Sequence, residues 1–213
     1  MAQKEEVYSA KDGKQRMKGV SISLPVVTGS IAFYLGKKAT EHASHRWTCY
    51  IRSATGEDMS HIIKKVQFGL HSSFPNANRM VEYAPFELTE VGWGEFNIAV
   101  TVFFHDDCGT ESVELTQHLA LYDSSGGNNA KRPIASEVFD EIVFYEPTEA
   151  FYRRIMGHEP TPAPPSQLAQ FHSQYNPQYD YRRIQHARQR VAQITANISA
   201  QLASTDAATA ELT

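Results

Sequence analysis

Two aromatic residues at the ends of expected β-strands have surroundings that suit ligand binding. Phe74 follows a strand and a His-Ser-Ser run, and Trp93 lies between Gly92 and Gly94, just before the strand that begins at Phe96. Glycines on both sides allow a ligand to approach the backbone and leave the Trp93 N–H free to donate. Aromatic side chains on loops at the end of a rigid scaffold commonly bind ligands. The same pattern fits two rings that only cap the core, and the residues alone leave both interpretations open.

The residue spacings that catalysis or metal binding would need are missing. The chain has no Gly-rich phosphate loop and no HExxH motif. His42 and His45 are three residues apart, but this pair alone does not make a metal site, and we expect none. His71 precedes Ser72 and Ser73, yet nothing nearby supplies the elbow and the acid that a nucleophilic serine needs. We therefore expect no enzyme, no metal and no cofactor.

The composition predicts a globular protein that is neither secreted nor a general nucleic-acid binder. Of 213 residues, 41% are hydrophobic and 21% are charged, which suffices for a real core. The net charge of -4 argues against a nucleic-acid binder, because such proteins need a basic surface. Two cysteines, Cys49 and Cys108, form no disulfide framework, which favours a reducing compartment. We expect no signal peptide and no transmembrane segment, because the N-terminal residues lack an apolar region and no apolar run approaches ~20 residues.

One stretch of the chain carries charge of a single sign. Residues 82–114 contain no Lys or Arg and eight acids, which are Glu82, Glu87, Glu90, Glu95, Asp106, Asp107, Glu111 and Glu114. A surface of one sign attracts a partner of opposite sign, and a basic peptide fits. Acids that serve only solubility would give the same pattern.

Alternation of apolar and polar residues with period two predicts a β domain over residues 20–146. The clearest strand is Phe96–Phe104, and others are expected near residues 22–33, 46–52, 62–71, 80–88, 113–121 and 134–144. Seven or so half-apolar strands bury their surfaces best as two packed antiparallel sheets, so we expect an all-β, immunoglobulin-like sandwich. Its core should include Trp47, Phe68, Ile98, Val100 and Val102.

The two ends of the chain lack the alternating pattern that predicts the sandwich. Residues 1–19 are expected to be a flexible leader and residues 147–177 a Pro-rich linker, since five of the ten prolines lie between positions 160 and 177. Residues 178–204 form the expected C-terminal helix, followed by a tail at 205–213. The helix has an apolar seam with coiled-coil spacing, made of Ile184, Ala187, Val191, Ile194 and Ile198. We expect the seam to dock on a partner helix; packing against the chain's own sandwich is the alternative.

Three stretches carry a family resemblance. They are residues 45–51 (HRWTCYI), 64–75 (KKVQFGLHSSFP) and 85–96 (PFELTEVGWGEF), supported by Phe103-Phe104 and residues 119–122 (LALY). Over about residues 20–145 the sequence resembles the YEATS family, and the Leu-His-x-Ser-Phe and Gly-Trp-Gly-Glu-Phe elements are specific in combination. Trp93 and the segment Val138–Phe144 resemble the subgroup found in histone-acetyltransferase and nucleosome-remodelling complexes.

The resemblance implies an eight-strand immunoglobulin-like fold that binds acetyl- or crotonyl-lysine of histone tails. Phe74 and Trp93 would sandwich the acyl amide, and Ser73 would form a hydrogen bond with it. The Trp93 backbone N–H would hold the acyl carbonyl, His71 would line the pocket, and the glycines on either side of Trp93 would shape the loop. These roles make the protein a nuclear chromatin reader and a complex subunit that binds no specific nucleic-acid sequence and no membrane.

One position departs from the family pattern. Where the family usually has an aromatic residue or His, this chain has Ala43 followed by Ser44, which would weaken one wall of the pocket. Ala43, Ser44, His45 and Glu95 are expected as peptide contacts.

Two other functions remain open at the level of sequence. The sandwich could be a scaffold or histone-chaperone-like subunit that reads no modification, or Phe74 and Trp93 could form a cation–π cage for methyl-lysine.

Overall fold

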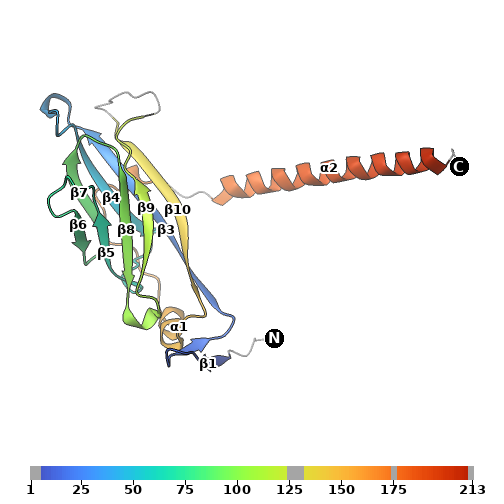
Figure 1. Ribbon diagram of the computed structural model, residues 1–213, viewed down its shortest axis with the longest axis horizontal. Coiled ribbons are helices and arrows are strands. Elements are labelled where there is room, and N and C mark those ends of the chain that lie inside the picture. The colour runs from blue at the N-terminus through green and yellow to red at the C-terminus, as the bar shows by residue number, and fades with distance from the viewer. Residues whose placement is uncertain (1–5, 124–131, 174–176, 211–213) are drawn as a thin grey trace. The chain divides into compact units, whose positions relative to one another are not determined.

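Two four-stranded antiparallel sheets pack face to face in the first of two compact units, Met1–Ser173 (Figure 1). The computed structural model describes residues 6–123, 132–173 and 177–210. One sheet has the order β10 (Ile134–Tyr145), β3 (Ser21–Tyr34), β4 (His45–Ser53) and β7 (Phe86–Gly92). The other has the order β6 (Asn78–Val81), β5 (Ile63–Gly69), β8 (Asn97–Phe104) and β9 (Ser112–His118). The expectation of an antiparallel β-sandwich is confirmed.

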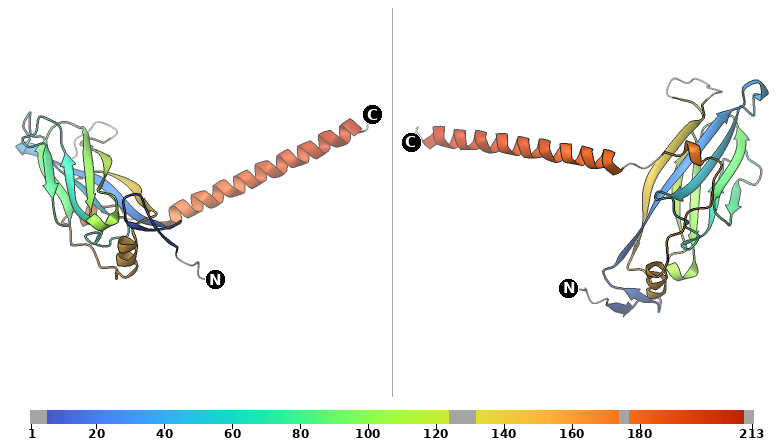
Figure 2. Two further views of the ribbon diagram at one scale, coloured as in Figure 1. Left: turned by 60° about the horizontal axis from the view of Figure 1, so that its bottom comes forward. Right: turned by 180° about the vertical axis from the view of Figure 1, so that it is seen from behind.

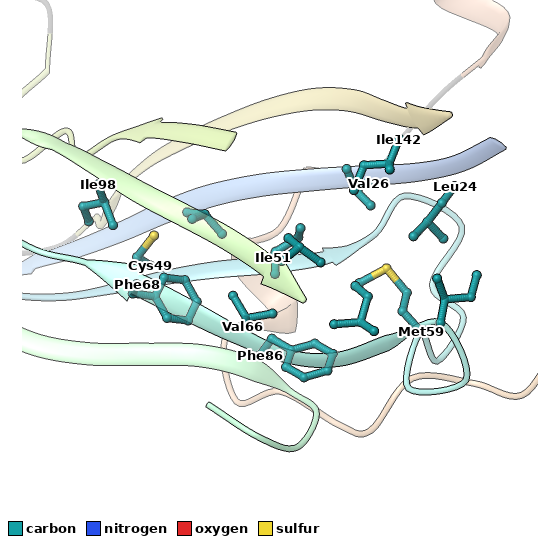
Figure 3. Packing of buried hydrophobic residues seen from close by; sticks show 14 of the residues in the cluster. Leu24, Val26, Cys49, Ile51, Met59, Val66, Phe68, Phe86, Ile98 and Ile142 are labelled. Carbon is teal, nitrogen blue, oxygen red and sulfur yellow. The ribbon is translucent and has the colours of Figure 1, made fainter. Parts of the chain in front are cut away.

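The core fills the space between the sheets with side chains that alternate inward from each strand. Trp47, Phe68, Ile98, Val100 and Val102 each have 0% exposure, as expected from the period-two pattern. Figure 3 shows Cys49 and Ile51 facing Phe68 and Val66 across the core.

The single strand expected near residues 80–88 is two strands in different sheets. β6 ends at Val81 and β7 begins at Phe86, and the turn between them contains the cis Ala84–Pro85 peptide. Pro85 has no N–H to donate to a ladder, so a continuous strand through it is disfavoured. The sandwich therefore has four strands in each sheet.

The leader expected at residues 1–19 forms a hairpin over its described part. β1 (Val7–Ser9) pairs with β2 (Gln15–Met17), and Met17 is 2% exposed. The Met17 N–H donates to the Pro147 carbonyl at 3.0 Å, and the Tyr8 hydroxyl donates to Glu146 at 2.6 Å. These partners lie about 130 positions away in sequence, and the pattern of residues 1–19 gives no sign of them.

The Pro-rich linker expected from residue 147 belongs to the same compact unit as the sandwich as far as Ser173. Helix α1 (Glu149–Met156) starts at the Thr148 cap and buries Phe151 completely, with its ring 4.9 Å from that of Phe144. Residues 157–173, here called the strap, then run back along the sandwich (Figure 2). The compact unit therefore ends at Ser173, whereas the expected domain ended at residue 146.

Backbone and ring contacts fix the strap against β4 and its neighbours. The Asp58 N–H donates to Thr161 at 2.8 Å, and the Ala163 N–H donates to Gly56 at 3.0 Å. Near the end of the strap, the Phe171 ring lies 5.3 Å from Phe33. Short 3-10 turns occur at η1 (Gly36–Lys38), η2 (Asp106–Cys108) and η3 (Ala169–Phe171).

Glu137 on β10 ties the strap to the sheet. Its carboxylate accepts from the Tyr50 hydroxyl at 2.6 Å and from the Ser173 N–H at 2.8 Å, and it pairs with Arg52 at 3.0 Å. Burial alone would raise the pKa of Glu137, but these donors outweigh it and lower the pKa. The Tyr50 ring also lies 4.8 Å from the ring of His172 in the strap, so Tyr50 contacts both Glu137 and the strap.

Helix α2 (Pro177–Ala210) is the only secondary-structure element of the second unit that the structure describes, and it extends past the expected end at residue 204. Alanines at 207, 208 and 210 favour helix, which accounts for the extension into the expected tail. The apolar residues Ile184, Val191, Ile194 and Ile198 are at least half exposed. No helix within the described ranges is long and apolar enough to cross a membrane.

We expect Gly29→Ala to destabilise the sandwich by about 1–3 kcal/mol, the usual range for overpacking. A Cβ at Gly29 would lie 2.4 Å from the Tyr50 ring, so Tyr50 would have to leave Glu137. Urea unfolding of the full chain measures the effect. In a Tyr50→Ala background the methyl group has room, so the same substitution should cost about 0.5 kcal/mol or less. An equal cost in both backgrounds would contradict the assignment to Tyr50.

Candidate ligand-binding site

Two loops at one end of the sandwich enclose a cavity of about 540 Å³, here called the loop cavity. The β5–β6 loop contributes His71, Ser73 and Phe74, and the β7–β8 segment contributes Trp93. The full lining consists of His42, His71, Ser73, Phe74, Val91, Gly92, Trp93, Gly94, Glu95 and Phe96. The structure thus brings together all six residues expected to bind an acylated lysine, and their role remains a prediction.

Aromatic contacts with the core fix one wall of the loop cavity. The Phe74 ring is half-buried and lies 5.9 Å from Trp47 and 5.7 Å from Phe96. Trp47 and Phe96 are themselves 6.0 Å apart in an edge-to-face arrangement. Because Trp47 is fully buried on β4, the position of Phe74 is set by the core.

The opposite wall combines a fixed backbone with an exposed side chain. The Trp93 carbonyl accepts from the Tyr122 hydroxyl at 3.3 Å, while the Trp93 side chain is 59% exposed. Glu95 accepts from the N–H groups of Leu121 at 2.7 Å and Tyr122 at 3.1 Å, which anchors the same segment. Within the described ranges, the Trp93 backbone N–H has no hydrogen-bond partner and is available to a ligand.

The absence of a side chain at Gly92 allows the Trp93 segment to pack closely against Trp47 and Phe74. A Cβ at this position would lie 3.2 Å from Trp47 Nε1 and 3.5 Å from Phe74 Cζ. A Cβ here would therefore crowd Trp47 and touch Phe74, so the position has little room for a larger side chain. Gly94 has no atom within 4 Å of an added Cβ, so it leaves open space instead.

His71 orients the hydroxyl group of Ser73. The Ser73 N–H donates to His71 Nδ1 at 3.3 Å, and Ser73 Oγ lies 2.9 Å from the same nitrogen. When Nδ1 accepts from the backbone it is unprotonated, so the hydroxyl donates to it as well. The lone pairs of Ser73 Oγ then remain free to accept from a ligand. The loop cavity thus offers one acceptor, at Ser73, and one donor, at the Trp93 N–H.

Three of the expected peptide contacts have structural roles, and their contact with a peptide stays a prediction. His45 is 1% exposed and lies between the Tyr34 and Tyr122 rings at 5.3 and 5.2 Å, because it points inward from β4. Ser44 donates its N–H to the Gly92 carbonyl at 3.2 Å and so holds the β7 end. Glu95 lines the cavity, and its Oε1 accepts from the two backbone donors described above.

Ala43 does not line the loop cavity, and the neighbouring His42 does. A tight turn, in which the Ala43 N–H donates to Thr40 at 3.2 Å, turns residue 43 away and leaves His42 exposed at the rim. The structure therefore puts His42 in the lining at this side of the cavity, and the effect of Ala43 on binding stays a prediction. Sequence spacing had raised His42 only as a candidate metal ligand, and the turn that places it has no clear signature.

The one-signed stretch at 82–114 is partly neutralised by bases from elsewhere in the chain. Glu90 pairs with Arg79 at 3.0 Å, and Asp106 pairs with Lys64 at 3.1 Å. Asp107 pairs with Arg154, whose hydrogen bonds lower the pKa of Asp107. Local charge in the sequence therefore overstates the negative charge of this surface.

Comparison with known proteins agrees with this geometry. A model of the YEATS family matches residues 42–123. Transcription initiation factor TFIID subunit 14b of Arabidopsis thaliana is 46% identical over 157 residues, which cover 73% of this chain and 59% of that protein. The Protein AF-9 homolog of Eremothecium gossypii is 40% identical over 150 residues, which cover 67% of this chain and 72% of that protein.

The solved structures include one close in both fold and sequence. The crystal structure of the Yaf9 YEATS domain bound to H3K27ac has a TM-score of 0.59 and 37% identity, and the match covers 67% of this chain and 99% of that one. The present chain spans less than two thirds of the Arabidopsis relative's length. Matches of this identity and coverage, on a sandwich of this topology, place the chain in the YEATS family.

Proposed function

We propose that the loop cavity binds an acylated lysine, acetylated or crotonylated, of a histone tail. The observation that carries the proposal is the slot between Phe74 and Trp93, with a free acceptor at Ser73 and a free donor at the Trp93 N–H. An acyl-lysine amide presents the complementary N–H and carbonyl. The bound peptide named for the similar Yaf9 domain carries an acetyl-lysine, which supports the same ligand class here.

The chemistry of the slot favours an amide over a free lysine. An acylated lysine is neutral and planar, so it enters between two rings without the desolvation cost of an ammonium group. An ammonium has only donors and would leave the Trp93 N–H opposite a positive charge. Glu95, the one acid of the lining, is held by two backbone donors at Oε1, which limits its approach to a methyl-lysine cation.

The proposed site is weak alone and suits a subunit of a larger assembly. Two ring contacts and two hydrogen bonds, each worth roughly 0.5–1.5 kcal/mol, must offset the entropy lost on association. We expect micromolar affinity, about -8 kcal/mol or weaker. The name of the Arabidopsis relative is that of a transcription initiation factor subunit, and we infer a nuclear chromatin complex in which further contacts raise the overall affinity.

Trp93→Ala should abolish the preference for acylated over unmodified histone peptide. It removes one wall of the slot, and because the side chain is 59% exposed, stability should change by only about 0.5 kcal/mol. Ser73→Ala should weaken binding by roughly 1–3 kcal/mol, because a buried amide N–H loses its acceptor. Calorimetry with matched acylated and unmodified peptides measures both.

Tyr83→Ala serves as the control for loss of an exposed aromatic ring, since Tyr83 is 81% exposed and does not line the loop cavity. It should leave peptide affinity unchanged. Equal affinity of the native protein for both peptides would favour a scaffold that reads no modification.

His42→Ala should weaken binding of the acylated peptide by about 0.5–1.5 kcal/mol, the scale of one aromatic contact. Ala43→Phe should have little effect, because residue 43 lies outside the lining. The same calorimetric titration tests both variants. A gain in affinity from Ala43→Phe, with no loss from His42→Ala, would restore Ala43 as the wall position.

Replacing Val191 and Ile194 of α2 with Asp should prevent the chain from entering its complex. Both residues lie on the exposed seam, where a charge cannot pack against a partner helix. Gln189→Asp with Gln193→Asp places the same charges on the other face and should leave assembly intact. Co-purification of tagged full-length chains reports assembly. Loss of the sandwich in the seam variant, seen by unfolding, would show that α2 is part of the domain.

A further inference from the structure

A second cavity of about 240 Å³, here called the strap cavity, lies between the strap and the end of β4 that is remote from the loop cavity. The register shows the separation: His45 at the start of β4 pairs with Gly92, while Ile51 near its end pairs with Phe86. The apolar part of the lining includes Met59, Phe86, Pro164 and Pro165, and the rings of Tyr50 and His172 also contribute.

The charge of the strap cavity is negative and largely uncompensated. Glu57, Asp58 and Glu87 line it, and Asp58 accepts from the Ser60 hydroxyl at 2.7 Å. Within the described part of the chain, the Glu57 and Glu87 carboxylates have no ion pair and no side-chain hydrogen bond.

The basic groups in the same lining do not neutralise these acids. Arg52 is committed to Glu137 at 3.0 Å and to the Ser173 carbonyl at 3.0 Å. Burial and the nearby Arg52 lower the pKa of His172, so the imidazole is neutral near pH 7. Within the described residues, the lining thus combines apolar surface with the partly buried carboxylate of Glu87 and the exposed carboxylate of Glu57, neither of them paired with a base.

The occupant that satisfies this lining has an apolar stem and a cationic head. We propose that the strap cavity binds an unmodified basic side chain of a peptide, arginine in preference to lysine. The stem buries against the prolines and Met59 while the head meets the carboxylates of Glu57 and Glu87. A guanidinium is planar, stacks on aromatic rings and is less strongly hydrated than an ammonium, which sets the preference.

The edge strand β7 joins the two cavities. Glu87 lines the strap cavity and Gly92 lines the loop cavity, and the strand between them spans about 17 Å at ~3.3 Å per residue. An extended peptide with an acylated lysine in one cavity therefore reaches the other about five residues away. This extension rests on the proposed function, whereas arginine binding in the strap cavity does not.

The test uses an acetyl-capped Gly-Ala-Arg-Ala-Gly amide, which contains no acylated lysine, and methyl-labelled methionine in the full chain. Met59 lines the strap cavity, and the other four methionines serve as internal references. The Met59 methyl resonance should shift saturably, with a dissociation constant on the order of 1 mM, as expected for one anchored side chain. Peptides with lysine or citrulline at the same position should bind more weakly, and citrulline, which keeps the stem without the charge, at least tenfold more weakly.

Glu57→Gln with Glu87→Gln should weaken arginine binding at least tenfold. Glu111→Gln with Glu114→Gln removes the same charge away from the cavity and should have no effect. Equal shifts with citrulline, equal losses in the two double variants, or no Met59 shift at millimolar peptide would each overturn the proposal. None of these outcomes bears on acyl-lysine binding, which the Trp93→Ala titration tests separately.

Discussion

The contact among Trp47, Phe74 and Phe96 joins the core of the sandwich to its binding surface. The three ring centroids lie 5.7 to 6.0 Å apart, and Trp47 is fully buried on the central strand β4. Phe74 therefore occupies one position before any ligand arrives. Gly92 completes the constraint, because any side chain there would meet both Trp47 and Phe74. A wall that is already ordered lowers the entropy lost on binding, and a site with so few contacts depends on that.

On the outer face of the sheet formed by β10, β3, β4 and β7, Glu137 holds neighbouring elements in place. Its carboxylate joins Tyr50, Arg52 and Ser173, so β4, β10 and the end of the strap converge on one buried charge. Breaking one member of such a group leaves the others unpaired, so the strap is held as a unit. The strap cavity exists because this network fixes the strap over β4, and the same network occupies the one arginine that would otherwise neutralise Glu87.

The sequence predicted what is encoded locally and missed what depends on distant contacts. Period-two alternation identified most strands, and the loop motifs around Phe74 and Trp93 identified the cavity walls, because each lies within about ten residues of the strand that carries it. The hairpin at 6–19 and the strap follow from bonds such as Tyr8 to Glu146 and Asp58 to Thr161, over separations of about 100 residues or more, and polar, proline-rich segments give no sign of them. At the site, a difference of one position decided the outcome: His42 reaches the rim, whereas Ala43 is held in a turn and His45 points into the core.

The two cavities would select lysines and arginines by opposite rules of charge. The loop cavity offers an aromatic slot with one donor and one acceptor, so under the proposed function it would admit a basic side chain only after acylation had removed the charge. The strap cavity offers two carboxylates beside apolar surface, so under our second proposal it would favour a side chain that has kept its charge. A peptide modified at one position and unmodified at another would satisfy both, while a fully acylated or a fully unmodified peptide would satisfy one. Each contact alone is weak, so joining them along β7 would turn two modest preferences into discrimination between patterns of modification.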